Sequence, residues 1–193
     1  MEENSRIEWD RRYRERSHSS LTPDPFLVSA YEEFVAPAFP NGGTALDLVG
    51  GVGRHALYLA ERGWQVTLVD VSPQGLALAE SEAKARRVSI TCRAEDLTEW
   101  ELPASSSDLV VNFFYLERAL FTQIEQALKP GGILIFKTYT QEQLKLSGGP
   151  THFMHLLGSD ELLHAFSGLQ ILHYYESTTG KAVAELVARK VSP

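Results

Sequence analysis

The sequence has little cysteine and no long apolar segment. Its single cysteine, Cys92, cannot form an internal disulfide, which suits a reducing compartment. No apolar run approaches the roughly 18 residues that a membrane-spanning helix needs. Residues 1–5 lack the basic start and apolar stretch of a secretory signal. These absences predict a cytoplasmic protein with no membrane partner.

Positive charge is also scarce. The 193 residues carry 18 Lys and Arg against 25 Asp and Glu, a formal net charge of -7. Nucleic acids and anionic membranes select basic surfaces, so we expect no nucleic-acid partner. The length suits a single domain, with residues 1–40 as a helical N-terminal cap segment and residues 41–193 as the main domain. Nothing in the sequence indicates an oligomeric state.

Hydrophobic periodicity predicts alternating strands and helices after the turn at residues 40–43. Two N-terminal helices are expected first, over 6–16 and 26–39. The expected strands are 45–49, 65–69, 89–93, 108–114 and 133–138, and the expected helices are 54–61, 72–86, 116–128 and 159–166. Residues 169–177 and 182–189 are strand-like and close enough to pair as an antiparallel hairpin. The pattern predicts an α/β, Rossmann-like protein with a seven-stranded, mostly parallel sheet and helices on both faces.

A glycine-rich loop joins the strand at 45–49 to the helix at 54–61. It follows Asp47 and contains Gly50, Gly51 and Gly53. Glycine lets the backbone approach a ligand closely and lets a helix start tightly against a strand. Asp70 ends the next strand, where a carboxylate can accept hydrogen bonds from two ribose hydroxyls. Loop and acid in this order predict a site for an adenosine-bearing ligand at the carboxyl ends of the strands.

With this motif, the chain resembles class I S-adenosylmethionine-dependent methyltransferases over about residues 40–190. Asp47, Gly51 and Gly53 match the acid and two of the alternate glycines of the family. Val49 stands where the family usually has glycine, and Gly50 is an additional glycine. We expect Val49 to crowd the methionine part of the cofactor, or Gly50 to shift the loop in compensation. The resemblance implies S-adenosyl-L-methionine as cofactor and S-adenosyl-L-homocysteine as product.

The resemblance also implies roles for residues beyond the loop. Asp70, followed by Val71, matches the ribose-binding acid, and Asp96 would bind the adenine amino group. Glu95 and Leu97 lie in the segment that would flank the adenine ring. Asn112 falls where the family faces the methionine moiety and the substrate, and the C-terminal hairpin matches the reversed seventh strand of the family.

A finer similarity concerns the N-terminal segment. Trp9 and Tyr13, Arg54 and residues 114–118 are similar to the small methyltransferases of tellurite resistance and thiopurine methylation. Those enzymes fold an N-terminal helix over the cofactor, so the similarity implies that Trp9 and Tyr13 close the pocket. The alternative is that the two residues are a packed aromatic helix face.

The predicted reaction is direct in-line displacement, in which a small acceptor attacks the sulfonium methyl group. Two alternatives stay open. Gly51 and Gly53, followed by Ala56 and Asp70, also fit the fingerprint of an NAD(P)-dependent oxidoreductase, although Asp47 and the antiparallel tail favour a methyltransferase. A non-catalytic cofactor-binding protein of the same fold is the second alternative.

The acceptor side carries few signals. We nominate no catalytic residue, although several side chains could serve as a general base: Tyr13, Tyr115, Tyr139, His152 and His155. His152 and His155 lack further ligands nearby in the sequence, so we expect no metal site. Arg118 is either a surface helix residue or an anchor for an anionic acceptor.

Overall fold

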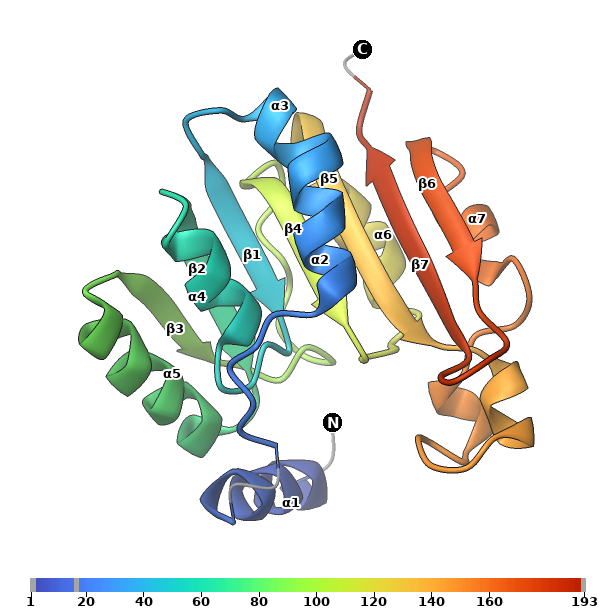
Figure 1. The fold of residues 1–193 in the computed structure, drawn as a ribbon, viewed down its shortest axis with the longest axis horizontal. Coiled ribbons are helices and arrows are strands. Elements are labelled where there is room, and N and C mark those ends of the chain that lie inside the picture. Colours follow the sequence, from blue (N-terminus) through green and yellow to red (C-terminus); the bar gives the residue numbers. More distant parts are fainter. Residues whose placement is uncertain (1–2, 16–17, 192–193) are drawn as a thin grey trace. The chain divides into compact units, whose positions relative to one another are not determined.

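The computed structural model describes residues 3–15 and 18–191, with side chains from residue 6 onward. The chain forms two compact units, Met1–Glu101 and Leu102–Pro193. Each unit contains its own strands and helices (Figure 1).

The first unit contains three parallel strands and the helices that flank them. Its elements are α1 (Glu3–Arg14), α2 (Pro25–Ala30), η1 (Tyr31–Val35), α3 (Ala36–Ala38), β1 (Thr44–Leu48), α4 (Arg54–Ala60), β2 (Gln65–Asp70), α5 (Pro73–Arg86) and β3 (Ile90–Ala94). β2 pairs in parallel with both β1 and β3, which gives the order β3-β2-β1. Strands β1 and β2 are apolar and almost wholly buried, as expected for parallel strands covered on both faces.

Local signals explain where the helices of this unit begin and end. The Ser72 side chain accepts a hydrogen bond from the Gly75 N–H, Pro73 occupies the first turn of α5, and Arg87 ends the helix in a left-handed conformation. The helix expected over 26–39 is helical up to Ala38. However, η1 in its middle is a π-helical turn rather than α-helix. α2 begins where the Asp24 carboxylate accepts a hydrogen bond from the Phe26 N–H.

The second unit contains four strands. Its elements are β4 (Ser107–Phe113), α6 (Leu120–Ala127), β5 (Leu128–Tyr139), the 3-10 turns η2 (Gln141–Lys145) and η3 (Phe153–His155), α7 (Glu161–Ala165), β6 (Gln170–Glu176) and β7 (Val183–Arg189). β4 and β5 are parallel, whereas β7 runs antiparallel to both β5 and β6. Phe121, Phe136 and Phe166 pack with ring centroids 5.3–6.0 Å apart, so α6 and the end of α7 cover the same face of β5.

Two expected boundaries in this unit are wrong. The helix expected from residue 116 begins at Leu120, because Phe114 adopts a left-handed φ of 60° and the Asn112 amide donates to the Tyr115 carbonyl in a turn. The strand expected from residue 133 begins at Leu128, because residues 129–132 join β5 as an irregular stretch. Its Gly131 N–H donates to the Lys190 carbonyl at 2.7 Å, which holds it in the sheet.

The predicted fold class is confirmed. Within each unit the strands pair in parallel except at β7, and the predicted C-terminal hairpin is the pair β6 and β7. The division into a cap at 1–40 and a domain at 41–193 stays a prediction. In the described parts of the chain, every helix is too short or too polar to cross a membrane.

Candidate functional site

The glycine-rich loop turns tightly between β1 and α4. Gly51 and Gly53 have φ of 57° and 79°, a left-handed conformation that favours glycine. A Cβ on Gly53 would lie 2.9 Å from the Cβ of Ala79 on α5, so this glycine also permits close packing of the helix. Gly50 has no room for a side chain beside Leu68 and the Asp47 carboxylate. The loop therefore requires the glycines that the sequence places there.

Val49 is the strained residue of this loop. It has a φ of 56°, which is an outlier for a β-branched side chain and costs about 1–2 kcal/mol. Val49 therefore lies in the left-handed region, which favours glycine.

Asp70 ends β2 and is bound to the glycine loop. Its Oδ2 accepts a hydrogen bond from the Gly51 N–H at 2.9 Å, and its Oδ1 accepts from the Ser72 N–H at 2.9 Å. Burial raises the pKa of Asp70 to about 6, although the hydrogen bonds from Ser72 and Gly51 favour the charged form. A carboxylate with remaining lone pairs beside the glycine loop is suited to accept hydrogen bonds from vicinal hydroxyls.

Asp47 lies in the interior of the first unit and is 1% exposed. Its Oδ2 accepts a hydrogen bond from the Ala56 N–H at 3.0 Å, at the first turn of α4. Its Oδ1 has no hydrogen-bond partner among the described residues. Burial raises the pKa of Asp47 to about 7. A buried, unpaired carboxylate oxygen at the glycine loop is a feature that a polar ligand would satisfy.

Helix α1 places Tyr13 against the glycine loop. Tyr13 is 6% exposed, and its hydroxyl lies so close to Gly51 that a Cβ on that glycine would collide with it. The ring also lies against Gly75 on α5, and Trp9 stacks on Tyr13 with ring centroids 5.7 Å apart. Trp9 and Tyr13 therefore lie at the loop that the similarity assigns to the cofactor, and they are a packed aromatic pair as well.

Asp10 fixes α1 to the start of α5, a role that the sequence analysis missed. Its carboxylate accepts hydrogen bonds from the Ser72 hydroxyl and, at 3.3 Å, from the Gln74 N–H. Free N–H groups at a helix start bind carboxylates well. The sequence shows Ser72 and Pro73 as a helix start, but no pattern connects them to a residue of α1.

The segment assigned to adenine follows β3. The Glu95 N–H donates to the Asp70 carbonyl at 3.2 Å, and Leu97 is buried. Asp96 caps a turn, since its Oδ1 accepts hydrogen bonds from the Thr98 N–H and hydroxyl at 2.9 and 2.8 Å. Val71 follows Asp70 and is half-buried. The roles of Val71 and residues 95–97 in cofactor binding stay predictions.

The second unit holds Asn112 and Arg118. Asn112 is 1% exposed and its amide is used in the turn after β4, so its role toward a ligand stays a prediction. Arg118 binds both carboxylate oxygens of Glu161, at 2.6 and 3.0 Å, and the carbonyls of Met154 and Leu156, both at 3.1 Å. The Arg118 guanidinium is therefore used to connect η3 with α7, which favours a structural role over binding of an acceptor.

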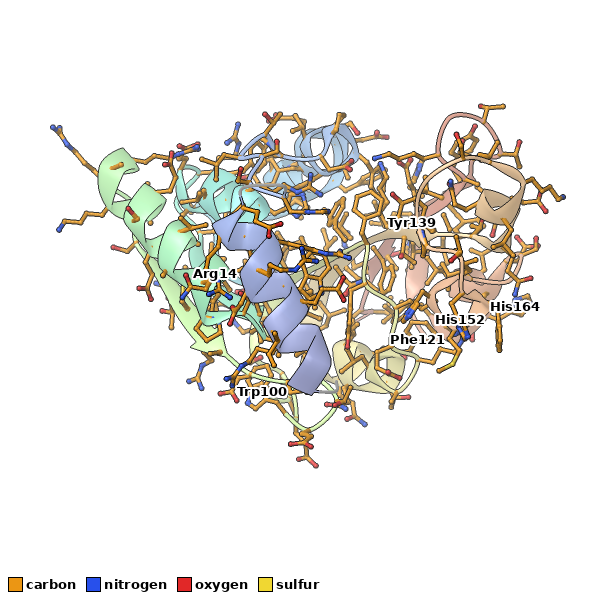
Figure 2. The ribbon with its side chains drawn as sticks, turned by 90° about the horizontal axis from the view of Figure 1, so that it is seen from below. Arg14, Trp100, Phe121, Tyr139, His152 and His164 are labelled. Carbon is orange, nitrogen blue, oxygen red and sulfur yellow. The ribbon has the colours of Figure 1, made fainter. Side chains whose placement is uncertain are left out.

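In the second unit, the candidate acceptor residues Tyr139 and His152 lie apart (Figure 2). Tyr139 packs against Phe114 with ring centroids 5.1 Å apart, at the end of β5. His152 and His155 are exposed, and Figure 2 shows His152 away from Tyr139. Among the residues whose placement is described, no group of three or more His, Cys, Asp or Glu side chains could hold a metal ion.

Comparison with known proteins agrees with this geometry. Residues 45–132, which include β1, the glycine loop, Asp70 and β4, match the model of a family described as a methyltransferase domain. The tRNA 5-carboxymethoxyuridine methyltransferase of Escherichia coli (strain K12) is 33% identical over 124 residues, 58% of this chain and 46% of that protein. The ubiquinone biosynthesis O-methyltransferase of Idiomarina loihiensis is also 33% identical over 124 residues, 61% of this chain and 51% of that protein. This chain thus spans about half the length of these curated relatives.

The fold is shared over nearly the whole chain. The crystal structure of TehB from Haemophilus influenzae superposes with a TM-score of 0.74 and 18% identity, covering 94% of this chain and 67% of that one. The chain is thus similar to class I S-adenosylmethionine-dependent methyltransferases in sequence and in fold, and TehB shares that fold. The cofactor of this class is S-adenosylmethionine. The glycine loop, the Asp70 carboxylate and the unpaired Asp47 oxygen fit such a group.

Proposed function

We propose that the protein transfers a methyl group from S-adenosylmethionine to a small acceptor molecule. The hydrogen bond between the Gly51 N–H and Asp70 carries this proposal, because it joins the glycine loop and the ribose-binding acid in one site. S-adenosylmethionine, when bound, supplies a methyl group on a positively charged sulfur. The protein contributes binding, orientation and exclusion of water.

The roles of the residues follow from their positions. The Asp70 carboxylate accepts hydrogen bonds from the ribose hydroxyls, and the glycine loop allows the backbone to approach the cofactor. Asp47 orients the loop through its bond to the Ala56 N–H. Tyr13 and Trp9 cover the loop from α1, and Tyr13 must yield some of the space beside Gly51 to the cofactor.

The tyrosines support an acceptor that needs no strong base. Burial and the nearby Asp70 carboxylate raise the pKa of Tyr13, and burial raises the pKa of Tyr139. Both phenols therefore keep their protons at neutral pH and cannot act as general bases there. His152 and His155 are exposed and outside the Phe114–Tyr139 pair. An acceptor that is already ionised, such as a thiolate or a carboxylate, suits this arrangement better than an alcohol.

An RNA acceptor is the second candidate, because one relative is named a tRNA methyltransferase. The formal net charge of -7 favours a small molecule over RNA, since RNA binding relies on basic surfaces. Transfer of labelled methyl groups to small thiols and carboxylates, compared with transfer to bulk tRNA, separates the two acceptor classes.

Calorimetric titration with S-adenosylhomocysteine tests the cofactor directly. We expect micromolar binding to the wild type, a loss of at least about tenfold in Asp70→Ala, and no change in Glu99→Ala, which removes an exposed carboxylate of the same unit. Thermal denaturation must first show that Asp70→Ala is folded. Stabilisation by NAD(H) or NADP(H) but not by S-adenosylhomocysteine would favour the oxidoreductase, and binding without any methyl transfer would favour a non-catalytic protein.

A further inference from the structure

The end of β5 carries an aromatic pair flanked by two ammonium groups. The Phe114 and Tyr139 rings lie 5.1 Å apart at 44°. The Lys137 Nζ is 5.8 Å from the centroid of the Phe114 ring, and the Lys181 Nζ is 5.4 Å from it. Both ammonium groups are within cation–π distance of the same ring. All four residues belong to the second unit, so their arrangement depends on that unit alone.

The two lysines differ in how their charge is balanced. The Lys137 Nζ forms an ion pair with the Glu185 carboxylate at 2.9 Å, and both side chains are largely buried. Lys181 is exposed, and within the described parts of the chain its ammonium forms no ion pair or hydrogen bond, only the contact with Phe114. Lys181 is therefore a cation without a carboxylate partner that lies over an aromatic ring.

The backbone next to Lys181 is firmly fixed. The Ala182 N–H donates to the side chain of Gln143, which is 2% exposed, at 2.9 Å. The Thr140 N–H donates to the Ala182 carbonyl at 3.0 Å. These two bonds attach the turn before β7 to the segment that follows β5. The backbone at Lys181 is therefore fixed by hydrogen bonds to the rest of the second unit.

Phe114 is held toward this cluster by a strained backbone. Its φ of 60° is left-handed, which costs a bulky residue about 1–2 kcal/mol, and its N–H donates to the Lys137 carbonyl at 2.7 Å. Strain of this kind persists where the surrounding structure enforces it, and it occurs often at ligand sites. The protonated Tyr139 hydroxyl is a donor beside the ring pair.

We propose that Lys181, Phe114 and Tyr139 form an acceptor subsite for a small planar molecule that carries a carboxylate or another anionic group. The rings supply a surface for stacking, and Lys181 supplies the positive charge that neutralises the anion. The inference rests on the proposed methyl transfer and adds the substrate class to it.

Two probe molecules of one shape test the subsite without any turnover. 4-(Methylsulfanyl)benzoate is planar and anionic, whereas 4-(methylsulfanyl)benzamide is its uncharged equivalent. Protein NMR titration of the full chain, following the backbone amides of Phe114 and Lys181, gives the affinity and the location together. We expect the benzoate to bind about tenfold more tightly than the benzamide and to shift these two amides.

Variants of exposed lysines separate a local effect from a change in net charge. Lys181→Ala should reduce benzoate affinity to that of the benzamide, and Lys181→Arg should keep most of it. Lys145→Ala should leave it unchanged, because this equally exposed lysine of the same unit is paired with Glu142. Equal binding of the two probes, normal benzoate binding by Lys181→Ala, or an equal loss in Lys145→Ala would overturn the proposal.

The cofactor titration keeps the two proposals distinguishable. Binding of S-adenosylhomocysteine without selective benzoate binding would overturn the subsite and leave methyl transfer standing. Selective benzoate binding that depends on Lys181, without any cofactor binding, would support the subsite and count against methyl transfer.

Discussion

The hydroxyl of Ser72 donates a hydrogen bond to the carboxylate of Asp10, 62 positions earlier in the chain. The same hydroxyl accepts a hydrogen bond from the Gly75 N–H at 3.1 Å, so Ser72 caps α5 and holds α1 at once. Ser72, the residue that caps α5, is therefore also the residue to which α1, the helix that carries Tyr13, is attached. On the proposed function, access of the cofactor to Gly51 depends on the stability of this attachment.

We expect Asp10→Ala to loosen α1. The change removes a charged acceptor from the start of α5, which contributes about 1–2 kcal/mol. Amide hydrogen exchange in α1 should accelerate about tenfold, whereas exchange in β1 and β2 stays the same. Glu8→Ala is the control, because Glu8 pairs only with Arg12 on the same helix among the described contacts. Unchanged exchange in Asp10→Ala would show that other contacts hold the helix.

Val49 provides a test of backbone strain in the loop. Val49→Gly removes the left-handed strain of about 1–2 kcal/mol but adds about 0.5–1 kcal/mol of chain entropy in the unfolded state. Val49→Ala keeps a Cβ in the same conformation and loses apolar contacts. The glycine variant should therefore have the higher free energy of unfolding of the two, by about 1 kcal/mol, measured by urea denaturation.

Cofactor affinity can be measured with the same two variants, Val49→Gly and Val49→Ala. Val49→Gly should bind S-adenosylhomocysteine at least as tightly as the wild type, because no side chain then projects from this position of the loop. An alanine variant that is both more stable and tighter in binding than the glycine variant would contradict the strain account.

Much of this site could be predicted because its signals are local. Asp47, the glycines and Asp70 lie at strand ends that the apolar pattern marks, and the hydrogen bond between Gly51 and Asp70 joins them as expected. The bond between Asp10 and Ser72 could not be predicted, because it joins distant segments and no sequence pattern connects the two residues. Such contacts depend on how helices pack, which the sequence around either residue does not encode.

The wrong boundaries in the second unit have a similar origin. Residues 116–119 suit a helix, but the left-handed Phe114 and the Asn112 side chain impose a turn on them. Residues 129–132 contain Pro130 and two glycines, which usually indicate a turn. Pairing with Lys190 nevertheless keeps them in β5. In both cases, contacts made in the folded unit overrode the local preference.

The buried Asp47 makes stability depend on pH in a definite direction. Its pKa is raised from 3.8 to about 7, so the folded state holds this proton more tightly than the unfolded state does. Its contribution is therefore most favourable at low pH and is lost as the pH rises through about 7. Asp47→Asn should gain about 2 kcal/mol of stability relative to the wild type between pH 5 and pH 8.

Urea denaturation at both pH values measures this difference. Glu99→Gln is the control, since Glu99 is exposed, and its difference from the wild type should not change with pH. A constant difference between Asp47→Asn and the wild type would mean that Asp47 is already charged in the folded protein at pH 5.

Arg118 should act as a clamp within the second unit. Arg118→Ala removes the paired contact with Glu161 and the bonds to the Met154 and Leu156 carbonyls. Because the side chain is 44% exposed, we expect a loss of only about 1–2 kcal/mol, confined to η3 and α7. Arg118→Lys should behave almost like the alanine variant, since one ammonium group cannot reach all of these acceptors with the planar geometry of a guanidinium.

Limited proteolysis distinguishes a clamp from an anchor for an acceptor. In both Arg118 variants the segment 152–157 should be cleaved several times faster, whereas Lys145→Ala, which removes an exposed ion pair of the same unit, should match the wild type. If cleavage is unchanged and binding of the benzoate probe is lost instead, Arg118 holds the anion and Lys181 does not. If cleavage is faster and benzoate still binds, Arg118 and Lys181 have separate roles. Arg118 then stabilises the segment that follows β5, and Lys181 binds the anionic acceptor.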